Sequence, residues 1–315
     1  MKHILVTGGC GYVGSVLTGS LLEQGFRVTV VDCQWFGNYL PPHPALTVIC
    51  EDVRNAEKIP LTGVDAIIHL ANVANDPCSE LNAKLAWEVN VLATMQLVEH
   101  AIKHGVGQFI YASSGSVYGV KEEAQVTEDL PLVPISDYNK TKMISERVLL
   151  SYQDQITIQC IRPATVCGVS PRMRLDLSVN MLTMQALTKG RITVFGGDQT
   201  RPNITIMDMI AVYRHFLTLG AAAPGIYNAG FENISILDIA RIVTGFVPAE
   251  IVVSESNDPR SYRQNSDKLL ATGFTPRYRV EDAIKMVIEG YRGGKIVDEE
   301  NCYNIKAMKH QGLAE

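Results

Sequence analysis

Residues 7–14 read TGGCGYVG and determine how the first half of the chain is interpreted. They lie between an apolar run at 4–7, which predicts a strand, and residues 13–24, which predict a helix. The glycines have the spacing G-x-x-G-x-x-G, at Gly8, Gly11 and Gly14. Such glycines allow a tight turn and let an anion approach the main chain, while the N–H groups that begin the helix face that anion. The stretch therefore predicts a site for the pyrophosphate of a dinucleotide.

An acidic residue at the end of the next strand predicts which dinucleotide is bound. The strand is predicted at 27–31 and is followed by Asp32, roughly 20 residues beyond the glycines, as this kind of site requires. A carboxylate there accepts a hydrogen bond from a ribose 2′-OH and repels a 2′-phosphate. Because neither Cys33 nor Gln34 supplies a cation, the sequence predicts NAD rather than NADP.

Apolar runs alternate with helical stretches through the rest of the first half. Strands are predicted at 46–50, 65–70, 108–113 and 156–162, and helices at 80–104 and 138–152. Apolar strands separated by helices indicate a parallel sheet with crossover helices, so residues 1–165 are predicted to form a doubly wound α/β domain. Asp52 and Val53 follow the third strand and are predicted to contact the adenine, with a simple turn as the alternative for Asp52.

The second half is less regular and predicts a smaller mixed α/β lobe over 166–315, with some segments returning to the first domain. Helices are predicted at 175–189, 207–219, 236–244 and 280–289, and strands at 192–195, 225–229 and 251–254. The residues after Gly294 are polar and are expected to lie at the periphery.

Composition and charge argue against several other classes of protein. The 315 residues carry a formal net charge of −5 and are 46% hydrophobic, so the chain is expected to be globular and not to bind nucleic acid. No run approaches the roughly 18 apolar residues of a membrane span, and the apolar run at 4–6 is too short for a signal peptide. The seven cysteines show no C-x-x-C spacing, which favours reduced thiols in a cytoplasmic protein and no metal site.

Two residues of the helix predicted at 138–152 suggest chemistry. Tyr138 and Lys142 are four residues apart and share a helix face. A nearby ammonium favours the phenolate and can lower a tyrosine pKa by roughly 1–3 units. The phenol could then remove the proton of an alcohol while hydride leaves for the cofactor. A second Y-x-x-x-K, at Tyr291 and Lys295, is set aside because two glycines interrupt its helix.

A serine lies where the reacting alcohol is expected. Residues 111–119 read YASSGSVYG, directly after a predicted strand. A hydroxyl at the carboxyl end of a strand can point into the crevice in which doubly wound sheets bind ligands. Ser114 is therefore predicted to hydrogen-bond the reacting oxygen beside Tyr138. A serine-rich turn is the alternative, and the order in which this run follows the glycine stretch favours the catalytic interpretation.

The glycine stretch, the S-S-x-S-V-Y-G run and Y-x-x-x-K, in this order, resemble the extended short-chain dehydrogenase/reductase family over roughly residues 2–292, in its sugar-nucleotide epimerase/dehydratase branch. The resemblance implies an NAD-binding Rossmann domain, a nucleoside-diphosphate sugar between the two lobes, and a catalytic set of Ser114, Tyr138 and Lys142. It implies cofactor contacts from Gly8, Gly11, Tyr12, Val13, Gly14, Asp32, Leu70, Ala71, Asn90, Ser113, Tyr138, Lys142 and Pro163.

The second lobe carries further points of resemblance. Residues 195–201, FGGDQTR, resemble the FGxGxxxR segment of the family, which implies that Arg201 clamps the substrate diphosphate. Residues 258–260, DPR, resemble a later segment in which Arg260 contacts a phosphate or ribose. Surface salt bridges are the alternative for both arginines. Thr165 matches a position that contacts substrate, although Thr stands where the usual pattern has Asn, and Cys167 where it has Tyr.

Two other departures bear on the reaction. Gly115 and Ser116 stand where 4,6-dehydratases have Asp and Glu, and neither residue can replace a carboxyl group as acid and base, so dehydration is not expected. Residues 170–177, SPRMRLDL, look more like a bacterial surface-polysaccharide branch that includes GDP-heptose 4-dehydrogenases. Arg172 and Arg174 in this loop are predicted to hold a phosphate or a sugar hydroxyl, with a surface role as the alternative.

The resemblance implies NAD-dependent oxidation at C4 of a nucleoside-diphosphate sugar, most simply by a 4-epimerase. A 4-dehydrogenase or 4-ketoreductase uses the same residues and remains the alternative, whereas a non-catalytic NAD sensor would not need the Tyr–Lys–Ser set. Relatives pair two helices per subunit into a homodimer, and apolar residues on the corresponding helices fit such an interface or an internal core: Leu85, Val89, Leu92, Met143 and Val148.

Overall fold

The computed structural model describes residues 1–255 and 261–314 and is built around a parallel seven-stranded sheet. Its strands, in spatial order, are β10 (Gly225–Ala229), β6 (Thr157–Pro163), β5 (Gln108–Ala112), β4 (Ala66–His69), β1 (His3–Thr7), β2 (Arg27–Asp32) and β3 (Leu46–Cys50). The order reverses between β1 and β4, which creates the crevice where doubly wound sheets bind ligands. The predicted α/β fold is confirmed.

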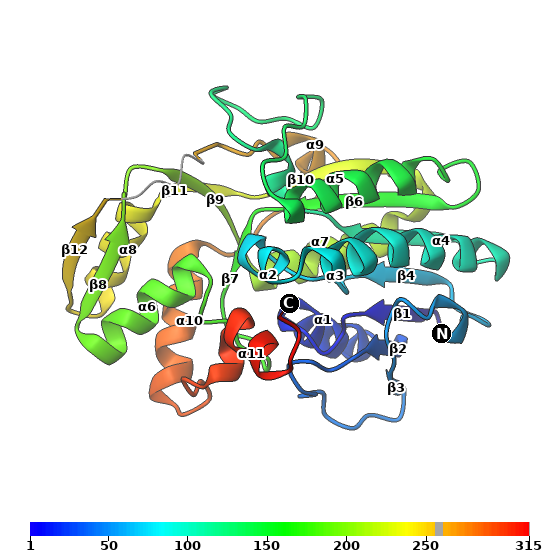
Figure 1. The fold of residues 1–315 in the computed structure, drawn as a ribbon, viewed down its shortest axis with the longest axis horizontal. Coiled ribbons are helices and arrows are strands. Elements are labelled where there is room, and N and C mark those ends of the chain that lie inside the picture. The colour runs from blue at the N-terminus through cyan, green and yellow to red at the C-terminus, as the bar shows by residue number, and fades with distance from the viewer. Residues whose placement is uncertain (256–260, 315) are drawn as a thin grey trace.

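Helices cover both faces of this sheet (Figure 1). They are α1 (Tyr12–Glu23), α2 (Asp76–Leu81), α3 (Ala83–Trp87), α4 (Ala93–Lys103), α5 (Asp137–Leu150) and α7 (Ile206–Leu219), with short helical turns at Ala56–Lys58, Gly115–Tyr118 and Gly220–Ala222. Successive residues of β1 point to opposite faces. Ile4 and Val6 therefore pack in the core beneath α1 and α7, whereas Leu5 packs in the core beneath α3, α4 and α5.

The helix predicted over 80–104 is interrupted, contrary to expectation. Asn82 is extended (φ −153°, ψ 90°), and its side chain accepts a hydrogen bond from the backbone N–H of Leu85 and so begins α3. A π-helical turn, Glu88–Leu92, then joins α3 to α4. The apolar pattern continues through both irregularities, so periodicity alone indicated one helix. The cause is the asparagine, whose side chain competes with helical backbone bonding.

The smaller lobe contains two sheets and a separate core. A mixed three-stranded sheet has the order β11 (Glu232–Ser235), β9 (Thr200–Thr205), β7 (Thr165–Cys167), and a parallel pair joins β12 (Glu250–Ser254) to β8 (Arg191–Phe195). Helices α6 (Ser178–Lys189), α8 (Ile236–Phe246) and α10 (Val280–Arg292) enclose the core, and α9 is Asp267–Leu270. Although they come from the second half of the chain, β10 joins the main sheet and α7 packs on α1. Helix α10 ends before Lys295, so the second Y-x-x-x-K does not share a helix.

The last residues are not peripheral, contrary to expectation. A short turn, Glu300–Cys302, leads into α11 (Asn304–His310), which returns to lie beside α2 (Figure 1). Met308 is 1% exposed and packs in the main core. The apolar residues of this segment are few and separated by polar ones, so the pattern gave no strong signal of burial.

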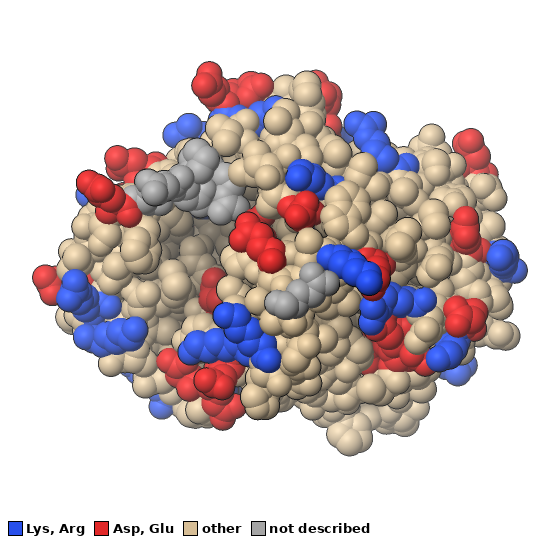
Figure 2. All heavy atoms as spheres, viewed as in Figure 1, with Lys and Arg blue, Asp and Glu red and all other residues tan. Residues whose placement is uncertain are grey.

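The surface charge and the length of the helices bear on nucleic-acid binding and on membrane insertion. On the face seen in Figure 2, acidic and basic side chains are interspersed rather than separated by sign. None of the helices in the described parts of the chain is long and apolar enough to cross a bilayer.

Candidate active site

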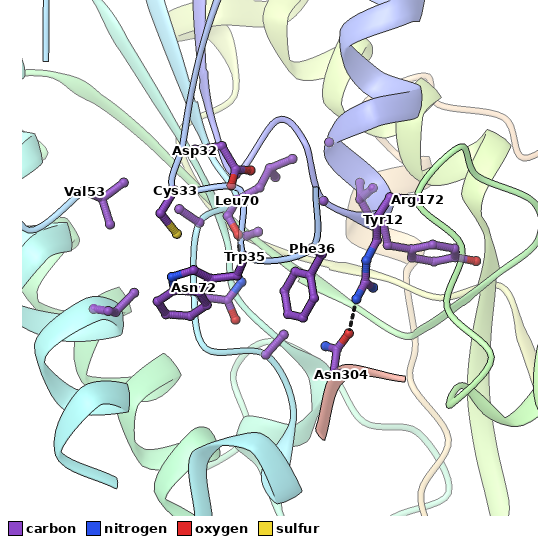
Figure 3. A pocket seen from close by; sticks show the side chains of 18 of the residues that line it. Tyr12, Asp32, Cys33, Trp35, Phe36, Val53, Leu70, Asn72, Arg172 and Asn304 are labelled. Carbon is purple, nitrogen blue, oxygen red and sulfur yellow. Dashed lines mark hydrogen bonds between the residues drawn. The ribbon is translucent and has the colours of Figure 1, made fainter. Parts of the chain in front are cut away.

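A pocket of about 220 Å³ is lined by residues at the carboxyl ends of β1, β2, β4 and β5. It brings together nearly all of the predicted cofactor residues: Gly8, Gly11, Tyr12, Val13, Gly14, Asp32, Asp52, Val53, Leu70, Ala71, Ser113, Tyr138, Lys142 and Pro163. Arg172 and Arg174, predicted for the substrate, line the same pocket. Among the lining residues that the sequence did not single out are Trp35, Phe36 and Asn304 (Figure 3).

The glycine stretch forms a cradle that side chains would fill. Gly8 has φ +71°, and a Cβ there would lie 2.6 Å from the backbone nitrogen of Ala71. A Cβ on Gly14 would lie 2.2 Å from the carbonyl oxygen of Gly8, so α1 can approach the turn this closely only with glycine. Gly11 precedes α1 and supplies no capping side chain. The backbone at this helix N-terminus is therefore accessible to an anion, as a dinucleotide requires.

Asp32 is held in place by the backbone around it. Its carboxylate accepts hydrogen bonds from the backbone N–H of Cys10 (2.9 Å) and of Gln34 (2.7 Å). Gln34 itself has φ 57°, in the left-handed region, so the chain turns sharply just after the strand that carries Asp32. Burial raises the pKa of Asp32, while these two hydrogen bonds oppose that rise. Asp52 also lines the pocket. Its carboxylate pairs with Arg54 at 2.8 Å and accepts the backbone N–H of Arg54, so it also stabilises the turn after β3.

Tyr138 and Lys142 line one end of the pocket, and Ser114 lies beside Tyr138 without being part of the lining. Ser136 caps α5 by accepting the backbone N–H of Asn139, which places Tyr138 in the first turn and Lys142 one turn later. The Lys142 Nζ donates to the Ala112 carbonyl oxygen (2.8 Å) and lies 5.8 Å from the centre of the Tyr138 ring. Ser114 follows β5. Its Oγ hydrogen-bonds Ser116 Oγ (2.7 Å), and it lies near enough to the Tyr138 phenol to favour the phenolate.

The pKa of Tyr138 is not lowered in the protein alone, contrary to expectation. Burial raises the pKa of Tyr138 to about 12, despite the opposing effect of Ser114, and lowers the pKa of Lys142 to about 7. In the protein alone, loss of solvation therefore outweighs any attraction between phenolate and ammonium. Lowering the phenol pKa requires further positive charge at this end of the pocket, which an oxidised nicotinamide would supply.

Asn90, predicted as a cofactor contact, lies behind the pocket wall. It is 1% exposed, and its amide accepts the backbone N–H of Val73 (2.8 Å) and donates to Thr141 Oγ1 (3.0 Å). Its backbone carbonyl oxygen accepts from Ser145 on α5. Asn90 thus ties the π-helical turn to the loop after β4 and to the helix that carries Tyr138.

A buried ion pair supports the catalytic end and was missed by the sequence reasoning. Glu146 lies one turn beyond Lys142, and Arg162 donates to its carboxylate from Nε (2.9 Å) and Nη2 (2.7 Å). Glu146 and Arg162 are 1% and 2% exposed. Ser113 donates to the same carboxylate, and Arg162 donates to the Tyr118 hydroxyl (2.7 Å). The available signal was an arginine ending an otherwise apolar strand, because a buried charge requires a partner.

His69 was also missed, and its burial gives a prediction about pH. Its ring nitrogens lie 2.6 Å from Thr7 Oγ1 and 2.9 Å from Thr94 Oγ1, and burial, with a smaller effect of Lys142, lowers its pKa to about 3. Between roughly pH 6.5 and 3 the unfolded chain binds a proton that the folded protein does not. As the pH is lowered through this range, the free energy of unfolding is therefore expected to decrease, by up to about 1.4 kcal/mol per pH unit from this group.

Chemical denaturation across this pH range, with and without His69→Gln, tests the prediction. The variant should lose this part of the pH dependence, whereas the exposed His43→Gln variant should follow the wild type. Identical slopes for wild type and His69→Gln would show that His69 is not held neutral by the fold.

Fewer of the residues predicted to bind the substrate lie in this pocket. Thr165 on β7 and Arg201 on β9 do not line this pocket, and Arg260 falls outside the described residues. Arg172 is 2% exposed, and Arg174 is nearly buried and pairs with Asp176 at 2.9 Å. The surface alternative for these two arginines is therefore wrong.

Comparison with known proteins agrees with this geometry. Residues 4–230 match the NAD dependent epimerase/dehydratase family. The chain belongs to this family. The predicted family is therefore confirmed, and with it an NAD-dependent enzyme that acts in nucleotide-sugar chemistry.

Individual relatives cover nearly the whole chain. It is 28% identical over 311 residues to the UDP-glucose 4-epimerase of Corynebacterium glutamicum, covering 89% of this chain and 94% of that protein. The structure resembles UDP-glucuronic acid 4-epimerase from Bacillus cereus, solved with UDP-glucuronic acid and NAD, with 27% identity and a TM-score of 0.82 over 93% of this chain and 99% of that one. MoeE5 in complex with UDP-glucose and NAD is 25% identical, with a TM-score of 0.82 over 94% and 100%.

Proposed function

We propose that this protein is a nucleotide-sugar 4-epimerase that oxidises C4 of a nucleoside-diphosphate sugar and then reduces it on the opposite face. The observation that carries the proposal is that Tyr138, with Ser114 beside it, and Lys142 line one end of a pocket whose other residues form a dinucleotide cradle. The 4-epimerases among its relatives support this choice of reaction. The base and the sugar are left to the experiment below.

The chain's own residues account for the proton transfers. NAD, when bound, supplies the hydride acceptor. Ser114 hydrogen-bonds the 4-hydroxyl beside the phenol, which fixes the oxygen that reacts. Tyr138 removes the hydroxyl proton as general base and returns it when the ketone is reduced. Lys142, anchored on the Ala112 carbonyl oxygen, holds a positive charge beside the pair when protonated.

Net 4-oxidation is the second candidate, because it uses the same three residues and because the 170–177 loop resembles that of a dehydrogenase branch. Incubation with UDP-, GDP-, dTDP- and CDP-sugars distinguishes the two reactions. An epimerase gives a mixture of two 4-epimers without lasting reduced-nicotinamide absorbance. A dehydrogenase gives that absorbance in proportion to a 4-keto product. Failure of every sugar to react or bind would contradict both.

The structure around Gly115 argues against dehydration. A Cβ at Gly115 would lie 3.1 Å from Oε1 of Gln264, a residue 2% exposed that donates to the Arg162 carbonyl oxygen. A side chain at position 115 would therefore press on Gln264 and on the Pro163 carbonyl oxygen, which lies 3.2 Å from the same Cβ.

Asp32 is expected to set the preference for NAD over NADP. Asp32→Asn keeps an acceptor for the Cys10 and Gln34 N–H groups but removes the charge that repels a 2′-phosphate. The ratio of NADP to NAD affinity is expected to rise about tenfold, which corresponds to the loss of one charged hydrogen bond and its repulsion. Isothermal titration with both dinucleotides measures it.

A matched control is Asp238→Asn on α8, an exposed acid far along the chain from the pocket. This variant should keep the wild-type ratio. An unchanged ratio in Asp32→Asn would contradict the role given to Asp32.

A homodimer is also proposed, through a smaller apolar surface than the sequence suggested. Leu85 and Val89 are buried in the core of the chain itself, and Met143 packs beside Tyr118. Leu92, by contrast, is 51% exposed on the π-helical turn, and Trp87 is 36% exposed on α3. Light scattering tests the proposal, and a monomeric mass at micromolar concentration would contradict it.

A further inference from the structure

Arg172 is a buried cation that forms no ion pair within the described residues, although the carboxylates of Asp32 and Asp176 lie near enough to act on its charge. It lies in the loop between β7 and α6, is 2% exposed, and lines the pocket that holds the glycine cradle and Asp32. Its Nη2 donates to Asn304 Oδ1 (2.7 Å) and to the Asn301 carbonyl oxygen (3.2 Å), both neutral acceptors. Its Nε has no hydrogen-bond partner, and no carboxylate in residues 1–255 and 261–314 forms an ion pair with it.

The neighbouring arginine behaves differently. Arg174 is paired with Asp176 through two hydrogen bonds of 2.9 and 3.1 Å, so its charge is neutralised within the loop. Burial and the charge of Arg174 lower the pKa of Arg172 to about 10, which still leaves Arg172 protonated at neutral pH. A buried guanidinium is costly unless an anion meets it, and its planar fork of donors suits a phosphate.

The position of Arg172 indicates which anion it meets. Its guanidinium lies 4.0 Å from the centre of the Phe36 ring, and Phe36 follows Asp32 by four residues (Figure 3). Tyr12, in the first turn of α1 beside the cradle, lies on the same side of the pocket as Arg172 in this view. The unpartnered donor thus lines the wall of a pocket whose other residues form a cradle for pyrophosphate.

The C-terminal segment, defined here as residues 300–310, keeps Arg172 in this position. Besides the two contacts from Asn301 and Asn304, Asn301 Nδ2 donates to the Phe36 carbonyl oxygen (2.7 Å) and to the Tyr39 hydroxyl (2.6 Å). The loop that carries Arg172, residues 36–39 and the C-terminal segment therefore meet at the pocket. The Arg172 guanidinium contacts both Phe36 and the C-terminal segment.

We propose that Arg172 binds the diphosphate of the dinucleotide and that the C-terminal segment, through Asn301 and Asn304, holds Arg172 over it. This inference rests on the proposed function only in taking NAD as the ligand of the pocket. It moves Arg172 from the substrate, where the sequence placed it, to the cofactor. It also makes the C-terminal segment a part of the cofactor site, which must release its contacts before the dinucleotide can leave.

Binding of NAD, ADP, adenosine and UDP to Arg172→Gln tests the assignment by titration, with Trp35 in the pocket wall as a fluorescence reporter. Arg172→Gln is expected to weaken NAD and ADP by roughly 10- to 100-fold, as for loss of a charged hydrogen-bonding partner, and to leave adenosine unchanged. Equal losses for ADP and adenosine would show that Arg172 only supports the adenine side. A loss confined to UDP would place it at the substrate, and unchanged binding of all four would also overturn the proposal.

Asn304→Ala keeps the arginine and removes its anchor, so it tests the inference even if Arg172→Gln folds poorly. NAD is expected to dissociate several-fold faster from this variant, measured by stopped-flow fluorescence, and an unchanged rate would refute the role of the C-terminal segment. Arg241→Gln, at an exposed arginine of α8, is the control and should match the wild type. A wild type that binds neither NAD nor ADP would instead overturn the proposed function itself.

Discussion

Replacing Tyr138 by Phe is expected to lower the rate of hydride transfer by about 10²- to 10⁴-fold while NAD stays bound. The change removes only the hydroxyl that accepts and returns the proton, and general acid–base catalysis contributes a factor of this size. The ring remains to fill the space between Ser114 and Lys142. Single-turnover absorbance of the reduced nicotinamide measures the rate, and titration with NAD measures binding.

The chain contains its own control for this experiment. Tyr291 begins the second Y-x-x-x-K, which α10 does not complete, because the helix ends at Arg292. Tyr291→Phe is the same chemical change at a matched sequence pattern and should leave turnover within about twofold of wild type, since the residue lies outside the pocket lining. Near-normal turnover by Tyr138→Phe would refute the proposed mechanism.

Breaking the Glu146–Arg162 pair is expected to cause the largest loss of stability. Glu146→Leu leaves the guanidinium of Arg162 buried at 2% exposure without its carboxylate, at a cost of about 3–5 kcal/mol in the free energy of unfolding. It also leaves the Ser113 hydroxyl without its acceptor, next to Ser114. Chemical denaturation monitored by circular dichroism measures the change.

Two further variants separate the mechanism from a general effect of substitution. Glu281→Gln breaks an exposed ion pair with Lys285 on α10 and should cost no more than about 0.5 kcal/mol. Glu146→Leu combined with Arg162→Met removes both buried charges and should recover much of the lost stability. If the double variant is less stable than Glu146→Leu, the cost comes from lost packing rather than from an unpaired charge.

The parts of the site that depend on short, local patterns could be predicted from the sequence. The glycine cradle needs a strand, a turn and a helix within residues 3–23, and Asp32 needs only the next strand. Tyr138 and Lys142 lie on one turn of one helix. The parallel order of the strands followed from the alternation of apolar strands with helices, which is why the fold class was correct.

Other features depended on contacts between distant segments. Asn82 interrupts a helix that the apolar pattern continues, because its side chain caps the next turn. The raised pKa of Tyr138 results from burial by the assembled fold, which no local pattern reports. Gln264, whose Oε1 would lie 3.1 Å from a Cβ at Gly115, comes from 149 residues further along the chain.

The sequence by itself determined the α/β class, the family and most of the residues that line the pocket, because hydrophobic periodicity and backbone turns are local properties. Only the tertiary structure decided which charged side chains are buried and which residues they pair with. Glu146 meets Arg162 across 16 positions, whereas Arg172 meets Asn304 across 132 and forms no ion pair in the described chain. Burial and pairing set the energy of a charge, and both exist only once segments distant in the sequence have packed together.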